Sequence, residues 1–176
     1  MKYLKIIKFA SIVILFTISN ELSAQFIDDF QSELLIDQSA KVGWAFRTGD
    51  GEAEINFSKK IGKSSAQIEI DATKDVNNIW WAIIRRNISE QIDIKQLTQE
   101  GYELRVEAKV KPSHAPRRIN LHFNTQRTTD FHSHLMEFDL SDTTNWHVIS
   151  MTTSGFDAQM DDEVFVQLAL MDWGIK

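Results

Sequence analysis

Hydrophobic and polar residues alternate along several short segments of this chain, and turn-forming residues separate these segments. Alternation with a period of two is typical of a β-strand that buries one face. Residues 92–100 are expected to form one helical turn or a loop, and no other segment has a helical pattern. The alternation predicts strands at 53–57, 65–70, 79–85, 102–110, 119–126, 134–140, 146–152 and 164–171.

Many short strands separated by turns favour an antiparallel β-sandwich of the jelly-roll type. The sequence contains no internal repeat and no linker rich in proline, glycine or serine. We therefore expect an all-β fold in which residues 25–176 form a single domain.

The N-terminal segment 1–24 has the pattern of a secretory signal peptide. Three lysines are followed by an apolar stretch at 9–18, and small residues at 23–24 allow cleavage before Gln25. A membrane-spanning helix needs about 20 apolar residues, so this stretch is too short for an anchor. We expect an exported protein, periplasmic or extracellular, with no membrane span in the mature chain.

Charge and composition narrow the possible functions. The net charge is −6, which makes nucleic acid an unfavourable partner, although an anion can bind where basic residues gather. The chain has no cysteine and therefore no disulfides. It also has no glycine-rich phosphate loop and no nucleophile elbow, so no cofactor is expected.

One predicted strand carries polar residues at every second position. Donor and acceptor groups of the asparagine, histidine and glutamine type suit sugar hydroxyls. This pattern predicts that one face of the strand is open and binds a ligand, and the alternative is an ordinary solvated face. The residues are Arg118, Asn120, His122, Asn124 and Gln126.

Two histidines follow this strand. If 119–126 and 134–140 form a hairpin, His132 and His134 come close to Asn124 or Gln126. The alternative is a pair of turn histidines without a role. Histidines two apart can also chelate zinc or copper, but no third ligand is evident, and no metal is expected.

Basic residues accompany the same central strands. Arginine binds a carboxylate or sulfate through two hydrogen bonds, so their concentration in an acidic protein indicates an anionic ligand. The alternative is surface pairing with nearby glutamates. The residues are Arg85, Arg86, Arg105, Lys109, Arg117 and Arg118.

Adjacent tryptophans at 80 and 81 must face opposite sides of a strand. Trp81 is a candidate sugar-stacking platform, and the alternative is that both Trp80 and Trp81 are buried. Trp44, Trp146 and Trp173 are expected in the core.

Four segments resemble the central strands of carbohydrate-binding jelly rolls. In those folds a strand with this tyrosine, leucine and lysine spacing precedes the binding strands, and a tryptophan opens the following core strand. The resemblance covers roughly residues 49–176 and implies a carbohydrate-active jelly roll. The segments are Gly101–Lys111, Ile119–Asn124, Met136–Leu140 and Trp146–Thr152.

The chain also resembles small exported proteins of marine bacterial loci for the breakdown of ulvan, a sulfated algal polysaccharide rich in uronic acid. One such jelly-roll type is an oligosaccharide dehydratase that eliminates water from a terminal uronic acid. Related jelly rolls continue past the Met-Asp-Trp-Gly segment at 171–174 into a final edge strand. The resemblance implies an acidic oligosaccharide or polysaccharide as partner.

Elimination next to a uronate needs a cation on the carboxylate and a base for the C5 proton. The first hypothesis is therefore a carbon–oxygen lyase, a dehydratase or a polysaccharide lyase. The candidate catalytic residues are the proton-transfer groups His122 and His134 and the carboxylate-binding groups Arg118 and Arg105. The candidate substrate-binding residues are Asn120, Asn124, Gln126, Lys109, Trp81 and His132.

Two other functions stay open. A non-catalytic carbohydrate-binding module is a common role for a small jelly roll, and a structural or adhesive surface protein is compatible with export. A glycoside hydrolase is less favoured, because the polar strand face lacks the pair of carboxylates that such enzymes use.

Overall fold

The computed structural model of the protein describes residues 26–31, 34–59 and 64–171. The predicted signal peptide and Trp173 lie outside these residues. Strands dominate the described part, which contains a single short helix. The elements are β1 (Trp44–Gly49), β2 (Glu54–Lys59), β3 (Ala66–Asp71), β4 (Trp81–Asn87), α1 (Ile94–Leu97), β5 (Glu103–Val110), β6 (Arg117–Thr125), β7 (Leu135–Leu140), β8 (His147–Ser154) and β9 (Val164–Met171).

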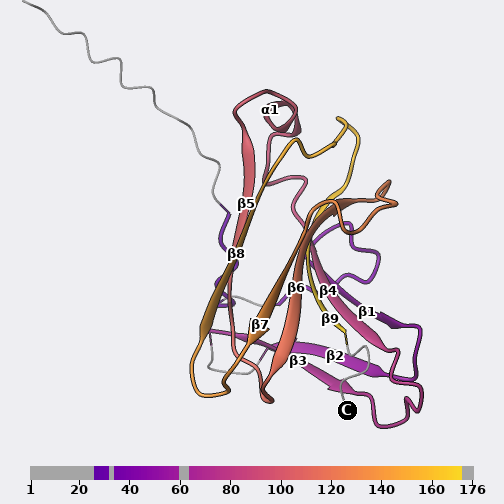
Figure 1. Cartoon of the computed structure of the whole chain (residues 1–176). Helices are drawn as coiled ribbons and strands as arrows, with labels where there is room; N and C mark the ends of the chain where they lie inside the picture. Colours follow the sequence, from indigo (N-terminus) through magenta and orange to yellow (C-terminus); the bar gives the residue numbers. More distant parts are fainter. Residues whose placement is uncertain (1–25, 32–33, 60–63, 172–176) are drawn as a thin grey trace, which may run out of the picture.

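The strands form one large sheet and two small ones. The large sheet has the order β1-β4-β9-β6-β7, while β2 pairs with β3 and β5 pairs with β8. All of these pairings are antiparallel. In Figure 1 the β5–β8 pair stands beside the large sheet, and the β2–β3 pair crosses at one end. The expected all-β fold with antiparallel sheets is confirmed.

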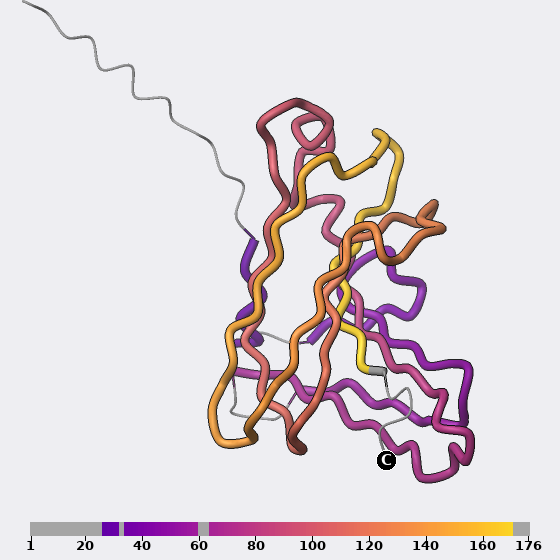
Figure 2. The backbone as a smooth tube through the Cα atoms, in the orientation of Figure 1, coloured from indigo at the N-terminus to yellow at the C-terminus, as the bar shows by residue number. Residues whose placement is uncertain are grey.

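One hydrophobic core joins the three sheets. It contains Ile84 and Leu121 from the large sheet, Phe57 from β2, and Leu104 and Ile149 from the β5–β8 pair. Figure 2 draws the backbone as a tube and lets the reader follow how the chain passes from one sheet to the next. Side chains at alternate positions of each strand enter this common core, as in a β-sandwich.

Each strand that the alternation predicts is present, with ends shifted by no more than two residues. The helical turn expected within 92–100 is α1, where the Asp93 side chain accepts a hydrogen bond from the Lys95 backbone amide at 2.9 Å. Strand β1 was not predicted. Its first three residues are all apolar, so it lacks the alternation on which the prediction relied.

The expectation for the tryptophans is correct for Trp44, whose ring contacts Phe57 in the core. It is wrong for Trp146, which is 55% exposed. Trp146 lies just before β8 and points to the same side as Val148, which is exposed. Ile149 and Met151, at the alternate positions, point into the core. The tryptophan therefore lies on the outer side of the sheet. Trp80 is buried, and Trp81 is partly exposed.

Candidate functional site

The polar side of β6 is not an open groove. Asn120, His122 and Asn124 are 5%, 3% and 3% exposed, and Arg118 and Gln126 are exposed beyond either end of this buried run. Strand β6 lies between β9 and β7 inside the large sheet. Neighbouring strands and side chains therefore cover the middle of β6 on both sides, and the expectation of an open face is wrong for these three residues.

The polar side of β6 nevertheless faces away from the common core. Leu121 and Phe123, at the alternate positions, enter that core. The strand registers place Arg85 of β4 opposite Gln167 of β9, and Gln167 opposite His122 of β6. Adjacent strands lie about 4.8 Å apart. We call Arg85, Gln167 and His122 the polar row, because they lie side by side across three strands.

His122 is the unusual member of the polar row. Neither of its ring nitrogens makes a well-formed hydrogen bond among the described residues, and the ring has only a weak contact with the Phe131 backbone. Burial lowers the pKa of His122, and the nearby backbone of Phe131 offsets only part of this effect. A buried polar group without a partner costs about 1–3 kcal/mol. Burial thus favours a neutral imidazole at His122, and the fold holds its ring nitrogens by no more than a weak contact with the Phe131 backbone.

Arg85 is also incompletely paired. Its guanidinium carbon lies 4.6 Å from the centre of the Phe165 ring, and its Nε atom is buried without a hydrogen-bond partner in the described part of the chain. The pKa of Arg85 is lowered by burial and by the charge of Arg47, and Glu163 only partly opposes this.

Arg47 reinforces the positive charge beside the polar row. It lies on β1 opposite Ile83, which shares its face of the sheet with Arg85. Within the described ranges, neither arginine forms an ion pair with a carboxylate. Because the arginines repel each other and Glu163 compensates this only in part, a bound anion would stabilise them.

Trp81 lies on the same face, at the β1 edge of the sheet. A Cβ atom added at Gly49 would come within 2.5 Å of Trp81 Cζ2, so the indole lies directly against the glycine. The indole Nε1 donates to Asp50 Oδ2 at 2.7 Å. Gly49 and Asp50 therefore fix a partly exposed aromatic ring next to Arg47, which suits stacking against a sugar.

Arg118 shares the face, but its charge is already compensated. Its Nε and NH2 atoms donate to the two carboxylate oxygens of Asp139 at 2.8 and 3.0 Å, and its NH1 atom lies 3.5 Å from Glu137. The hydrogen bond from Arg118 lowers the pKa of Asp139. Arg85 and Arg47 are consequently better placed than Arg118 to bind a carboxylate.

His134 does not meet His122. The hairpin register pairs His122 with Leu135, so His134 lies on the other face of the sheet, next to Phe123. Its Nδ1 atom is 2.5 Å from Thr153 Oγ1, and its ring lies edge-on to Phe156. His134 lines a pocket of about 200 Å³ beside the β6–β7 connection, separate from the polar row.

Arg105 and Lys109 also lie elsewhere. Both are exposed residues of β5 at positions that alternate with core residues, so they face outward from the β5–β8 pair. Arg105 NH2 is 3.5 Å from Glu107. The four candidate catalytic residues therefore do not converge in one cleft.

The last two candidates have local partners. His132 is exposed, and its Nδ1 atom is 3.6 Å from Asp130. Gln126 donates to Asp162 at 2.9 Å and accepts from the Glu163 amide at 2.8 Å, which ties two loops together. Among the described residues no group of three potential metal ligands is present.

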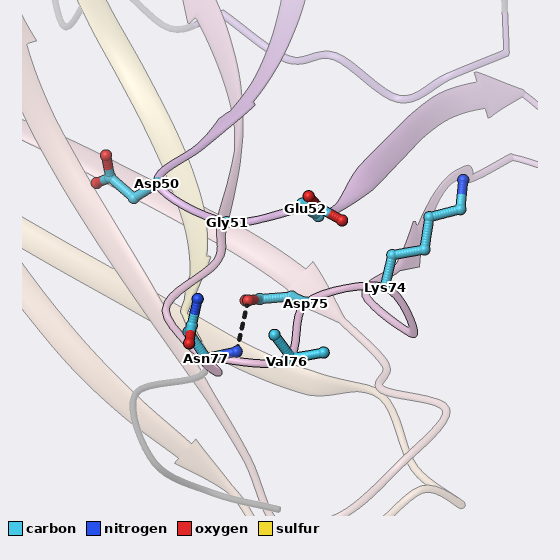
Figure 3. Close-up of a pocket in the computed structure, with 7 residues that line it drawn as sticks. All are labelled: Asp50, Gly51, Glu52, Lys74, Asp75, Val76 and Asn77. Carbon is cyan, nitrogen blue, oxygen red and sulfur yellow. Dashed lines mark hydrogen bonds between the residues drawn. The ribbon is translucent and has the colours of Figure 1, made fainter.

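A second pocket, of about 380 Å³, lies beside the loop after β3 (Figure 3). Its central carboxylate belongs to Asp75, which accepts hydrogen bonds from the backbone amides of Asn77, Ile79 and Trp80 at 3.1, 3.0 and 2.9 Å. Because backbone amides of the loop already bond to this carboxylate, it stabilises the turn and is not available to bind a ligand.

Sequence reasoning missed Gln167 and Arg47. Gln167 is the one polar residue within the apolar segment Val164–Met171, and that interruption was an available signal. Arg47 belongs to the strand that was not predicted.

Scans against protein-family models, curated proteins and solved structures gave no match. In the described part of the chain, no helix has the length and apolar character to cross a membrane.

Proposed function

We propose that this protein is a carbon–oxygen lyase that acts next to a uronic acid in acidic algal oligosaccharides such as ulvan. The observation that carries the proposal is the polar row, where a weakly bonded neutral histidine and an incompletely paired arginine lie on one face of the sheet. The resemblance to ulvan-degradation proteins supports the same reaction class.

In this proposal Arg85, with Arg47 beside it, binds the uronate carboxylate. Neutralising the carboxylate makes the C5 proton more acidic, because the charge that develops on removing that proton spreads onto the carboxylate. Gln167 lies between Arg85 and His122 and donates a hydrogen bond to the same group. Asn120, the next residue on this face of β6, binds a sugar hydroxyl.

His122 is the proposed base. Its lowered pKa keeps the imidazole neutral at neutral pH, as proton abstraction requires. The C5–H electron pair forms the C4–C5 double bond as the C4–O bond breaks, and the proton taken by His122 passes to the leaving oxygen. Because His122 is 3% exposed, the proposal requires side chains above the ring to move when substrate binds.

The test is incubation of the full chain with ulvan oligosaccharides while the ultraviolet absorbance of the unsaturated uronate is followed. His122→Ala and Arg85→Ala are expected to lower the rate by at least about a hundredfold, the usual contribution of a general base. Arg105→Ala is the matched control, because that arginine faces outward from another sheet. If the His122→Ala variant turned over substrate at the wild-type rate, His122 would not be the base.

A second candidate function is a non-catalytic carbohydrate-binding module with a jelly-roll topology. The placement of the Trp81 ring against Gly49 favours it, because an aromatic ring fixed on a sheet is a common sugar platform. Calorimetry of the same oligosaccharides distinguishes the two functions. Binding that is lost in Trp81→Ala, without turnover by the wild type, would establish the module instead of the lyase.

A further inference from the structure

The outer face of the β5–β8 pair exposes an aromatic and an aliphatic side chain next to each other. Trp146 and Val148 are 55% and 58% exposed. Ile149 and Met151, at the other parity, belong to the core. Large apolar side chains grouped on an exposed surface mark interaction sites more often than isolated ones. Trp146 and Val148 are therefore more than incidental surface residues.

Cationic residues accompany this tryptophan. Lys109 lies opposite Val148 in the strand register, and Lys111, two residues further along, donates to the Thr144 carbonyl oxygen at 2.8 Å. Glu107, the next residue of this face along β5, is paired with Arg105 at 3.5 Å, and Asp142, in the turn before Trp146, accepts hydrogen bonds from the Thr144 and Asn145 amides at 2.8 and 2.9 Å. Among the described residues neither Lys109 nor Lys111 forms an ion pair with a carboxylate, so both ammonium groups can neutralise a bound anion at this end of the face.

We propose that Trp146, Val148, Lys109 and Lys111 form a surface site for an acidic polysaccharide chain, separate from the polar row. The indole ring stacks against the C–H face of a sugar, and the two lysines neutralise its carboxylate or sulfate groups. The outward face of β8 continues with Ser150 and Thr152, whose hydroxyls can bond to sugar hydroxyls.

The dimensions of the face agree with an extended polymer. Strands β5 and β8 each have 8 residues, and a strand rises about 3.4 Å per residue. Figure 1 shows the two strands as a long, narrow pair standing beside the large sheet. A face of this length accommodates several sugar units in a row.

Charge argues against a second copy of this chain as the occupant. A two-fold symmetric dimer places the same patch on both sides of the interface. The lysines of both copies, Lys109 and Lys111, would then gather in one interface, and concentrating like charges there is unfavourable. A polyanion removes this repulsion.

Affinity electrophoresis of the full chain tests the proposal, with polygalacturonate, dextran sulfate and neutral dextran as the polymers in the gel. We expect both polyanions, and not dextran, to retard the wild type. Trp146→Ala and the double variant Lys109→Ala/Lys111→Ala are each expected to bind at least about fivefold more weakly, which corresponds to the loss of about 1 kcal/mol. Circular dichroism confirms that the exposed substitutions leave the fold intact.

Two controls separate this site from the lyase proposal. Thr129→Ala, far from this face in the β6–β7 connection, should bind like the wild type, and His122→Ala should retain polymer binding whatever happens to turnover. If the polyanions retarded the Trp146→Ala variant as strongly as the wild type, the proposal would be overturned. A wild type that no polyanion retards, or a dimer in sedimentation analysis that Trp146→Ala dissociates, would overturn it as well.

Discussion

The guanidinium of Arg127 and the carboxylate of Asp162 meet through two hydrogen bonds, Nε to Oδ1 at 2.8 Å and NH2 to Oδ2 at 2.6 Å. This pair joins the β6–β7 connection to the loop before β9. The Asp162 side chain is buried and also accepts from the Gln159 amide at 2.7 Å and from Gln126 at 2.9 Å. A single carboxylate thus organises both loops at this end of the sheet.

Asp162→Ala should therefore lower the free energy of unfolding by about 2 kcal/mol at neutral pH, because Arg127, Gln126 and the Gln159 amide lose their hydrogen bonds to a buried carboxylate. The pKa of Asp162 is lowered, chiefly by the hydrogen bond from Arg127. Its contribution is present above the unfolded pKa of about 3.9 and is lost as the pH falls through the folded value. Urea denaturation at several pH values measures this, and Asp161→Ala, an exposed neighbour, serves as the control. Equal stability of the Asp162 and Asp161 variants at neutral pH would contradict the prediction.

His122→Leu should stabilise the protein by about 1 kcal/mol at neutral pH while it removes activity, because an apolar side chain replaces a buried ring whose only polar contact is a weak one with the Phe131 backbone. The pKa of His122 is lowered by burial, so the folded state resists protonation. Wild-type stability should fall as the pH drops below about 6.5, the unfolded value, toward the lowered folded value.

The His122→Leu variant should lose that part of the pH dependence, which chemical denaturation at neutral and mildly acidic pH detects. His132→Leu is the control, since His132 is exposed. A less stable His122→Leu protein would show that the imidazole is bonded in the native fold.

Gly49→Ala should displace the Trp81 ring, because the new Cβ would lie 2.5 Å from Trp81 Cζ2. We expect a loss of about 1–3 kcal/mol of stability, typical of overpacking, together with weaker oligosaccharide binding. Thermal melting and calorimetry measure the two effects. At Gly155 an added Cβ meets no atom within 4 Å, but φ is +64°, so Gly155→Ala should lose stability through backbone strain alone and leave oligosaccharide binding unchanged. Unchanged oligosaccharide binding in Gly49→Ala would remove Trp81 from the proposed site.

Expression of this chain in a bacterial host tests the predicted signal peptide, and residues 1–24 should be removed on export. N-terminal sequencing of the exported protein is expected to begin at Gln25. A replacement of Ala24 by a bulky residue should block the cut, because signal peptidase requires small residues there. Retention of the uncut protein in the cytoplasm would contradict the prediction of export.

The sequence by itself determined the positions of most strands and which of their side chains share a face. Alternation along 119–125 separates Leu121 and Phe123 from Asn120 and His122, and the structure keeps that separation. This succeeds because the period of two is a local property of an extended backbone. The same property could not identify β1, whose apolar residues are consecutive.

Only the tertiary structure decided which faces are covered and which residues meet. His122 and His134 are both even-numbered, yet the hairpin register pairs His122 with Leu135 and thereby sends the two histidines to opposite faces. Arg85, Gln167 and His122 become neighbours only when β9 enters between β4 and β6. Register and strand order depend on the packing of whole layers, and no local pattern in the chain specifies them.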